Sequence, residues 1–236
     1  QWASLDQIAK GRTLLGVCIG GAHEGELRAF GVKREERVGR MKEGIELLRQ
    51  IWGDVDVVHR GKYYTLEGYN IMPKPVQKPP PIWIAVSPER EQAGDKVVDQ
   101  AMRRVGELAD GYITMGVTAE ELGKRLRVIE QTANETGKDL SNFEVAIHGM
   151  VNINDDKQAA YRQAKDYFNH YYGPTYPPES LIKVWLAHGP AKDCARLIQE
   201  WIDMGITTPV LRFTAKDQLA QMKRFIDEVL PLLRLN

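Results

Sequence analysis

The sequence predicts a parallel α/β fold, and two observations carry this prediction. Short apolar runs of strand length alternate five times with longer segments whose apolar residues recur every three or four positions, as in amphipathic helices. The run Ile82–Val86 is apolar at every position, which is typical of a strand covered on both faces of a parallel sheet. A proline-rich stretch leads into this run, and proline favours the extended backbone that precedes a strand.

The first half of the chain is expected to contain two strands, separated by a helix and a hairpin. The helix is predicted from Val38, Met41 and Ile45, which begin an apolar series with helical spacing. Two short runs of β-forming residues on either side of Gly61 predict the hairpin. In order, the expected elements are a strand at 13–18, a helix at 36–52, a hairpin at about 55–66, a strand at 82–86 and a helix ending near 110.

The second half continues the alternation of strands and helices. Thr118 with Glu121 three residues later has the pattern of a helix-capping box, and Gly137 and Gly205 end two of the expected helices. In order, the expected elements are a strand at 112–115, a helix at 118–137, a strand at 143–153, a helix at 155–172, a short helix at 179–186, a helix at 190–205, a strand at 209–213 and a closing helix at 219–230.

The composition narrows the class of protein. Of the 236 residues, 43% are hydrophobic, which is enough to form a core. Lys and Arg total 32 and so do Asp and Glu, so no net charge favours nucleic acid or an anionic membrane as a partner. No apolar run is long enough to span a membrane. We expect a cytoplasmic location, because the two cysteines make no disulfide framework and the first residues show no signal peptide. No metal site is expected, because no Cys/His pair has the spacing of metal ligands.

Six segments of the chain, taken together in their order and spacing, resemble the bacterial luciferase-like family of flavin- or F420-dependent oxidoreductases. They extend over essentially the whole chain, which makes a chance match improbable. The segments are Ser4-Leu5-Asp6 through Gly11-Arg12 to Leu15-Gly16-Val17, Glu36-Arg37 with 43–52, 61–66, the proline run with 82–85, 108–112 and 210–213.

The resemblance implies a (β/α)8 TIM barrel in which the first strand of this chain corresponds to the fourth strand of the family. Residues 1–236 are then expected to form a single luciferase-like barrel domain that lacks the first three βα units and carries the hairpin as an insertion. Such a part of a barrel exposes two strand edges. We therefore expect further βα units or a partner to cover the opening.

The resemblance also implies where a cofactor binds. The active site of such barrels lies at the C-terminal ends of the strands, and the cofactor's phosphate or ribityl chain is placed against the turn after the strand at 82–86. Backbone N–H groups and the Ser87 hydroxyl at a helix start suit an anion, although Ser87 could instead only cap the helix. The turn after the first strand is expected to approach the cofactor ring. The cofactor-binding residues implied are Ile19, Gly20, Gly21, Ala85, Val86, Ser87 and Pro88.

Four further residues are candidates for catalysis or substrate binding. Glu24 is the acid nearest to the turn after the first strand and is a candidate general acid, with a solvated loop carboxylate as the alternative. His148 lies on a predicted strand, where it could donate a proton, contact the ring, or be a hydrogen-bonded core histidine. Arg212 interrupts an apolar strand and needs an anionic partner, which could be substrate, cofactor or a structural salt bridge. Lys183 matches a substrate lysine of sugar-phosphate-using F420-dependent dehydrogenases, but a second such lysine is Thr118 here, so a sugar phosphate is not favoured.

The function implied is that of an oxidoreductase that binds FMN or coenzyme F420 and acts on a small organic substrate. FMN would indicate monooxygenation, and F420 would indicate hydride transfer. The expected partners are a flavin or F420 reductase that supplies reduced cofactor and a second copy of the chain in a homodimer. Two alternatives stay open: a non-catalytic flavin-binding protein and an inactive truncated barrel fragment.

Overall fold

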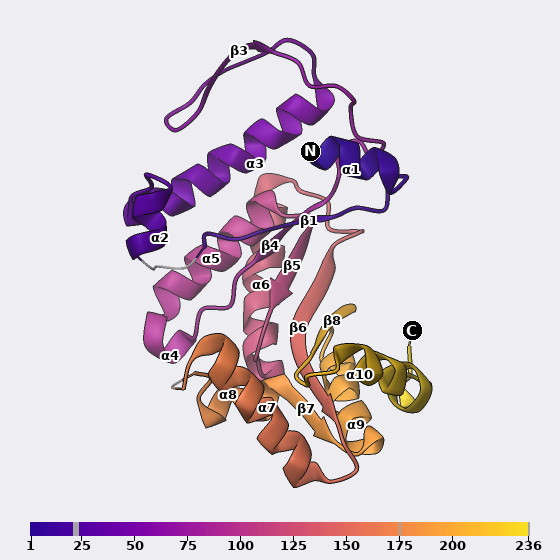
Figure 1. The fold of residues 1–236 in the computed structure, drawn as a ribbon. Coiled ribbons are helices and arrows are strands. Elements are labelled where there is room, and N and C mark those ends of the chain that lie inside the picture. The colour runs from indigo at the N-terminus through magenta and orange to yellow at the C-terminus, as the bar shows by residue number, and fades with distance from the viewer. Residues whose placement is uncertain (21–23, 175, 236) are drawn as a thin grey trace.

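A six-stranded parallel sheet is the frame of the protein. The computed structural model describes residues 1–20, 24–174 and 176–235. The strands follow the order β1-β4-β5-β6-β7, β8 also pairs with β6, and a separate two-stranded hairpin consists of β2 and β3 (Figure 1). The strands of the sheet are β1 (Leu15–Val17), β4 (Ile82–Ala85), β5 (Gly111–Thr114), β6 (Glu144–Ile153), β7 (Leu186–Gly189) and β8 (Thr208–Phe213), and those of the hairpin are β2 (Val57–Arg60) and β3 (Thr65–Tyr69).

Helices follow most of the strands, as expected for a βα alternation. The final helix α10 continues into a π turn at Phe225–Val229 and a 3-10 turn at Leu230–Leu232. The α-helices are α1 (Trp2–Ile8), α2 (Glu24–Ala29), α3 (Arg37–Gly53), α4 (Arg90–Ala93), α5 (Asp95–Leu108), α6 (Ala119–Thr136), α7 (Lys157–Tyr172), α8 (Glu179–Trp185), α9 (Ala191–Asp203) and α10 (Gln218–Arg224).

The long strand β6 organises the sheet. Its first part, Glu144–Ile147, pairs with β5, and its last part, Met150–Ile153, pairs with β7. β8 pairs with Ala146–Val151, a stretch that overlaps both of these. Because a strand has two edges, β5 and β7 share one edge of β6 and β8 lies along the other.

The register of the strands fixes which side chains share a face, since residues paired across a ladder point to the same side and successive residues alternate. Ile84, Tyr112 and Val145 are paired across three strands, and they are buried in one cluster with residues of α5, α6 and α9. This is the outer, helix-covered face. The opposite, inner face carries Gly16, Trp83, Ala85, Ile113, Ala146, His148, Met150 and Arg212.

Two helices cover part of the inner face. Met150 is buried in a second cluster with Phe168 from α7 and with Leu181 and Trp185 from α8. These helices lie near the C-terminal end of β6 (Figure 1). They therefore lie beside the C-terminal ends of the strands, where ligands bind in parallel α/β barrels.

The expected alternation is confirmed, but the expected number of strands was wrong. β7 forms a sixth strand at Leu186–Gly189, in residues that sequence patterns assign to the end of a helix and to the connection after it. Four residues are too few to show a period, and their strand conformation depends on pairing with the end of β6. The capping box is confirmed, because the Thr118 hydroxyl accepts a hydrogen bond from the Glu121 N–H at 3.3 Å.

The hairpin is present, with its turn later in the chain than expected. The strands were expected at 55–58 and 63–66, whereas they run from Val57 to Arg60 and from Thr65 to Tyr69. The Glu43 carboxylate on α3 accepts hydrogen bonds from the N–H groups of Tyr63, at 3.0 Å, and Tyr64, at 2.8 Å. This contact from a distant helix holds residues 61–64 in the turn, and local sequence does not reveal it.

A buried carboxylate ties α1 to the proline-rich segment before β4. Asp6 is fully buried and accepts hydrogen bonds from the Thr13 hydroxyl at 2.6 Å, the Val76 N–H at 2.8 Å and the Gln77 N–H at 3.0 Å. Burial by itself raises the pKa of Asp6, but these hydrogen bonds outweigh it and lower the pKa to about 2. Asp6 thus helps to fix the path of the chain into β4.

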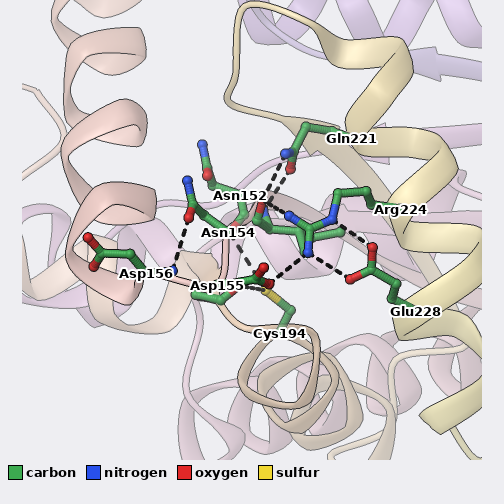
Figure 2. A network of polar contacts seen from close by, with 10 residues as sticks. Asn152, Asn154, Asp155, Asp156, Cys194, Gln221, Arg224 and Glu228 are labelled. Atoms are coloured by element: carbon green, nitrogen blue, oxygen red, sulfur yellow. Dashed lines mark hydrogen bonds and ion pairs between the residues drawn. The ribbon is translucent and has the colours of Figure 1, made fainter.

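A polar network joins the C-terminal helix to the end of β6 (Figure 2). The Gln221 side chain accepts a hydrogen bond from the Ile153 N–H at 2.7 Å and donates one to its carbonyl at 2.9 Å. Arg224 contacts Asp155 at 2.9 Å and Glu228 at 2.7 Å, and both carboxylates raise its pKa. The network gives buried backbone groups at the strand end their partners and fixes α10 there.

Within the described residues the sheet has unpaired outer edges at β1, β7 and β8. Among these residues, β1 pairs only with β4 and β8 only with β6. Both strands are only partly buried, in contrast to the central strands. The sheet is therefore an open part of a barrel. In the part of the chain that the structure describes, no helix combines the length and apolar character needed to cross a membrane.

Candidate functional site

A cavity of about 300 Å³ lies at the C-terminal ends of β4 and β5. The turns after the two strands contribute Ser87, Glu89, Met115 and Gly116 to its walls. The first half of α6, including Arg125, and one side of α8 complete it. The other lining residues are Glu91, Val117, Thr118, Glu121, Ser180, Leu181 and Val184. Its position is the one at which parallel sheets bind ligands, because the loops after adjacent strands converge there.

Arg125 joins the two turns that form this cavity. It projects from α6 and is only 3% exposed. Its guanidinium donates to the Ser87 hydroxyl at 3.3 Å, to the Thr114 hydroxyl at 3.1 Å and to the Pro88 carbonyl at 2.7 Å. Glu121, one helical turn earlier, balances its charge at 2.9 Å. The turns after β4 and β5 are thus held together from below by one side chain.

The structure defines which groups of the turn after β4 remain available to a ligand. The Val86 N–H donates a hydrogen bond to the Ile113 carbonyl at 3.0 Å, and Pro88 has no N–H. Ser87 donates its hydroxyl hydrogen to the Met115 carbonyl at 2.8 Å, so this hydroxyl can meet a ligand only as an acceptor. Among the described residues, the N–H groups of Ser87 and Glu89 find no acceptor.

A second cavity, of about 390 Å³, lies beyond β1 and between α2 and α3. Ile19 and Gly20 line it, whereas Gly21 lies outside the described residues. Gly20 has a φ of +73° and open space where a Cβ would stand, so a ligand could approach its backbone closely. Glu24 is exposed at the start of α2 and does not line this cavity; Glu26, two residues later, does.

His148 and Arg212 face the same side of the sheet. Two tyrosines of α7 cover Arg212, with its guanidinium carbon 4.2 Å from the Tyr171 ring centre and 5.6 Å from that of Tyr167. Burial, and then the nearby Arg212 charge, lower the pKa of His148, which favours a neutral imidazole at neutral pH. We call His148, Tyr167, Tyr171 and Arg212 the inner-face cluster.

Among the described residues, the inner-face cluster contains one buried polar group without a partner and one cation without a carboxylate. No carboxylate among the described residues forms an ion pair with Arg212, and the salt bridge considered from the sequence is therefore not found there. The buried Tyr167 hydroxyl likewise has no hydrogen-bond partner in the described part of the chain. Because an unpaired buried polar group is costly, the Tyr167 hydroxyl points to a polar group of a ligand or to water, whereas Arg212 is only partly buried and has Tyr171 as a side-chain partner.

Lys183 is not brought together with Arg212. It lies on α8 and lines two cavities whose other walls come mainly from α9, including Leu197 and Glu200. α9 packs on the outer face of the sheet, whereas Arg212 points to the inner face. The two candidate substrate residues thus belong to different surfaces. No group of three or more potential metal ligands occurs in the described residues.

Sequence reasoning missed Arg125 and the α7 tyrosines. Arg125 could have been found, because it falls among Leu122, Ile129 and Ala133 on the buried side of its helix, where a charge requires a partner. Tyr167 and Tyr171 gave no such signal, since their approach to Arg212 depends on the path of α7 over the sheet.

Comparisons with known proteins agree with this architecture. A family model described as luciferase-like monooxygenase matches residues 1–208. The F420-dependent glucose-6-phosphate dehydrogenase of Kineococcus radiotolerans is 24% identical over 253 residues, a match that covers 99% of this chain and 72% of that protein. The corresponding enzyme of Amycolatopsis mediterranei is 25% identical over 260 residues and is covered to 73%.

Solved structures show the same fold. A structure of an F420-dependent secondary alcohol dehydrogenase in complex with an F420-acetone adduct has a TM-score of 0.80 at 21% identity, covering 98% of this chain and 73% of that one. A monooxygenase from Streptomyces bottropensis has a TM-score of 0.76 at 20% identity, covering 98% and 71%. The open parallel sheet is thus part of a luciferase-like barrel, and the chain belongs to the luciferase-like monooxygenase family.

Proposed function

We propose that this chain binds FMN or F420 and acts as an oxidoreductase on a small organic substrate. The observation that carries the proposal is the cavity at the C-terminal ends of β4 and β5, whose turn after β4 keeps two N–H groups available above a buried arginine. Family membership supports the same cofactor class, because relatives include F420-dependent dehydrogenases and an FMN-containing monooxygenase.

The residues present fit the polar chain of such a cofactor. The N–H groups of Ser87 and Glu89 can donate to a phosphate, and Arg125, whose charge Glu121 balances, holds the turn that carries them through the Pro88 carbonyl. Ala85 and Val86 precede this turn, and the open space at Gly20, in the segment after the neighbouring strand β1, would admit a flat ring. When bound, FMN or F420 supplies the redox chemistry, and the protein supplies position, shielding and proton transfer.

The inner-face cluster is the proposed place for the substrate. Arg212 and the Tyr167 hydroxyl would bind an anionic or strongly polar group of the substrate, and His148 would act as a neutral hydrogen-bonding group or exchange a proton with it. Glu24 stays a candidate general acid, although its position at the start of α2 is exposed. A reductase that supplies reduced cofactor and a homodimeric assembly belong to the same proposal.

One observation favours an alternative, a flavin-binding or inactive partial barrel. Within the described residues the sheet has unpaired outer edges at β1, β7 and β8. A cofactor ring lying over the inner face would then be less shielded from solvent than in a closed barrel.

Reconstitution with each cofactor tests the proposal. The chain is mixed with FMN or F420, freed of excess ligand, and examined by absorbance, because the two chromophores absorb at different wavelengths. The proposal predicts retention of one of them and, with a reductase present, its reoxidation by a substrate. Retention without turnover would favour the flavin-binding alternative, and retention of neither would refute cofactor binding.

A further inference from the structure

Helix α10 and the turns that continue it carry more apolar surface than the chain buries. Their inward side packs Phe225 and Val229 against the main core, and Val229 is fully buried. The neighbouring side is apolar too, but it is exposed, and its side chains recur every three or four residues, so they form one stripe. This α10 stripe consists of Leu219, 57% exposed, Met222, 42%, Ile226, 50%, and Leu230, 37%.

The α10 stripe is large enough to be a contact surface. Its four side chains expose on the order of 300–400 Å², the size of the largest apolar patch on a typical monomer, which is often functional. The same βα unit also has a free strand edge, because β8 pairs with β6 alone within the described residues. This end of the sheet therefore offers a partner both backbone hydrogen-bonding groups and an apolar helix face.

The opposite end of the sheet has the complementary shape (Figure 1). The outer edge of β1 is also free in the described part of the chain, and the cavity of about 390 Å³ lies beyond it, between α2 and α3. Phe30, 77% exposed, lines this cavity. At the packing density of protein interiors, about three aliphatic side chains fill such a space. The other apolar walls include Leu27, Val32, Met41, Ile45 and Leu48.

The geometry of parallel sheets brings these two surfaces together. In a right-handed βα unit, the helix after a strand packs on the outer face between that strand and the next one. Here α5 after β4 and α6 after β5 both pack on the outer face. With β1 of a second copy as the strand next to β8, α10 lies over the outer face of that β1 and beside its α3. This is the position of the cavity.

We propose that two copies of the chain form a dimer in which β8 of each copy pairs in parallel with β1 of the other. The α10 stripe of each copy then fills the cavity between α2 and α3 of its partner. Strands β1, β4, β5, β6 and β8 form one continuous parallel series. A twofold axis parallel to the barrel axis joins two such series into one closed barrel and makes the two contacts equal. The outer edges of β1 and β8 are then both paired.

The size of the contact suits a stable dimer. Each copy contributes its stripe to one contact and its cavity to the other. Two contacts that bury on the order of 300–400 Å² on each side amount to roughly 1,200–1,600 Å², which is within the range of stable protein–protein interfaces. The inference deepens the homodimer of the proposed function by naming the surfaces that form it, and it holds whether or not a cofactor binds.

Sedimentation equilibrium of the full chain without cofactor tests the assembly. At micromolar concentration the wild type should have twice the mass of one chain. Ile226→Glu places a charge on the α10 stripe and Phe30→Glu places one at the cavity, so each variant alone should be a monomer. Val97→Glu, at a 49% exposed apolar position of α5, is the matched control and should stay dimeric. Circular dichroism verifies that the variants fold, and Leu219→Glu replaces Ile226→Glu should that variant unfold.

A mixture of the two variants tests the pairing of stripe and cavity. In a dimer of one Ile226→Glu chain and one Phe30→Glu chain, both charges fall in one contact and the other contact stays intact. The mixture should therefore form dimers that neither variant forms alone. A mixture that stays monomeric, dimers that persist in both variants, or a mass that rises without limit would overturn the proposal. A monomeric wild type would overturn it too, and would leave both surfaces to a different partner.

Discussion

Replacing Asp6 by asparagine should destabilise the protein in a pH-dependent manner. The buried Asp6 carboxylate accepts hydrogen bonds from the Thr13 hydroxyl and from the N–H groups of Val76 and Gln77. It thereby links α1 to the segment that enters β4. An asparagine side chain has one oxygen in place of two, so it cannot accept all of these hydrogen bonds. The variant therefore leaves buried donors without partners.

The magnitude follows from the pKa of Asp6, which the fold lowers from 3.8 to about 2. One pKa unit is worth about 1.4 kcal/mol, so the carboxylate contributes roughly 2 kcal/mol to the free energy of unfolding at neutral pH. A lowered folded-state pKa stabilises above the unfolded-state pKa and ceases to do so as the pH falls through the folded-state value. The contribution is therefore complete above about pH 5, falls to about half near pH 3, and vanishes below about pH 2.

Urea unfolding at pH 7, 5 and 3 measures this directly. The deficit of Asp6→Asn relative to the wild type should be roughly 2 kcal/mol at pH 7 and 5 and clearly smaller at pH 3. Asp166→Asn, on an exposed position of α7, serves as the control and should change stability by less than about 0.5 kcal/mol. A deficit that is absent at pH 7, or equally large at pH 3, would refute the reasoning.

Three further substitutions test the site. Gly116→Ala places a Cβ against Leu181 Cδ1 at a positive φ of 53°, and it should lower the free energy of unfolding by about 1–3 kcal/mol in urea titrations; an unchanged midpoint would contradict the packing of α8 on this turn. Arg212→Met should reduce kcat/KM for a polar or anionic substrate at least about tenfold and leave cofactor affinity unchanged. Equal effects on kcat/KM and on cofactor affinity would indicate that Arg212 contacts the cofactor instead of the substrate. Glu91→Gln removes an exposed carboxylate from the cavity and should tighten FMN or F420 by up to about fivefold in titrations; weaker binding would contradict an anion subsite there.

Elements with a strong local pattern could be predicted from the sequence, whereas those formed by distant contacts could not. The strand at Ile82–Ala85 and the cap at Thr118 follow from an apolar run and a capping box. β7 has no local period of its own and forms because the end of β6 offers it a free edge. The hairpin turn lies two residues later than expected because Glu43 of α3 binds it.

The site shows the same division. The turn containing Ser87 was predicted as a cofactor contact, and the structure places it at a cavity. How Ser87 is used could not be foreseen, since its hydroxyl is engaged by Met115 and Arg125, which come from other elements. His148 and Arg212 lie on the same face of the sheet because of the register between β6 and β8, and no local sequence pattern encodes that register.

Hydrogen exchange of the chain with and without cofactor tests most directly whether FMN or F420 binds at the C-terminal ends of β4 and β5. Amide exchange is measured by mass spectrometry at saturating ligand, with riboflavin as the phosphate-free comparison. Binding at this cavity predicts ligand-dependent protection of residues 86–89 and 115–121, and weaker protection of 86–89 with riboflavin. Binding without protection of either segment, or protection confined to the outer helices α9 and α10, would contradict it.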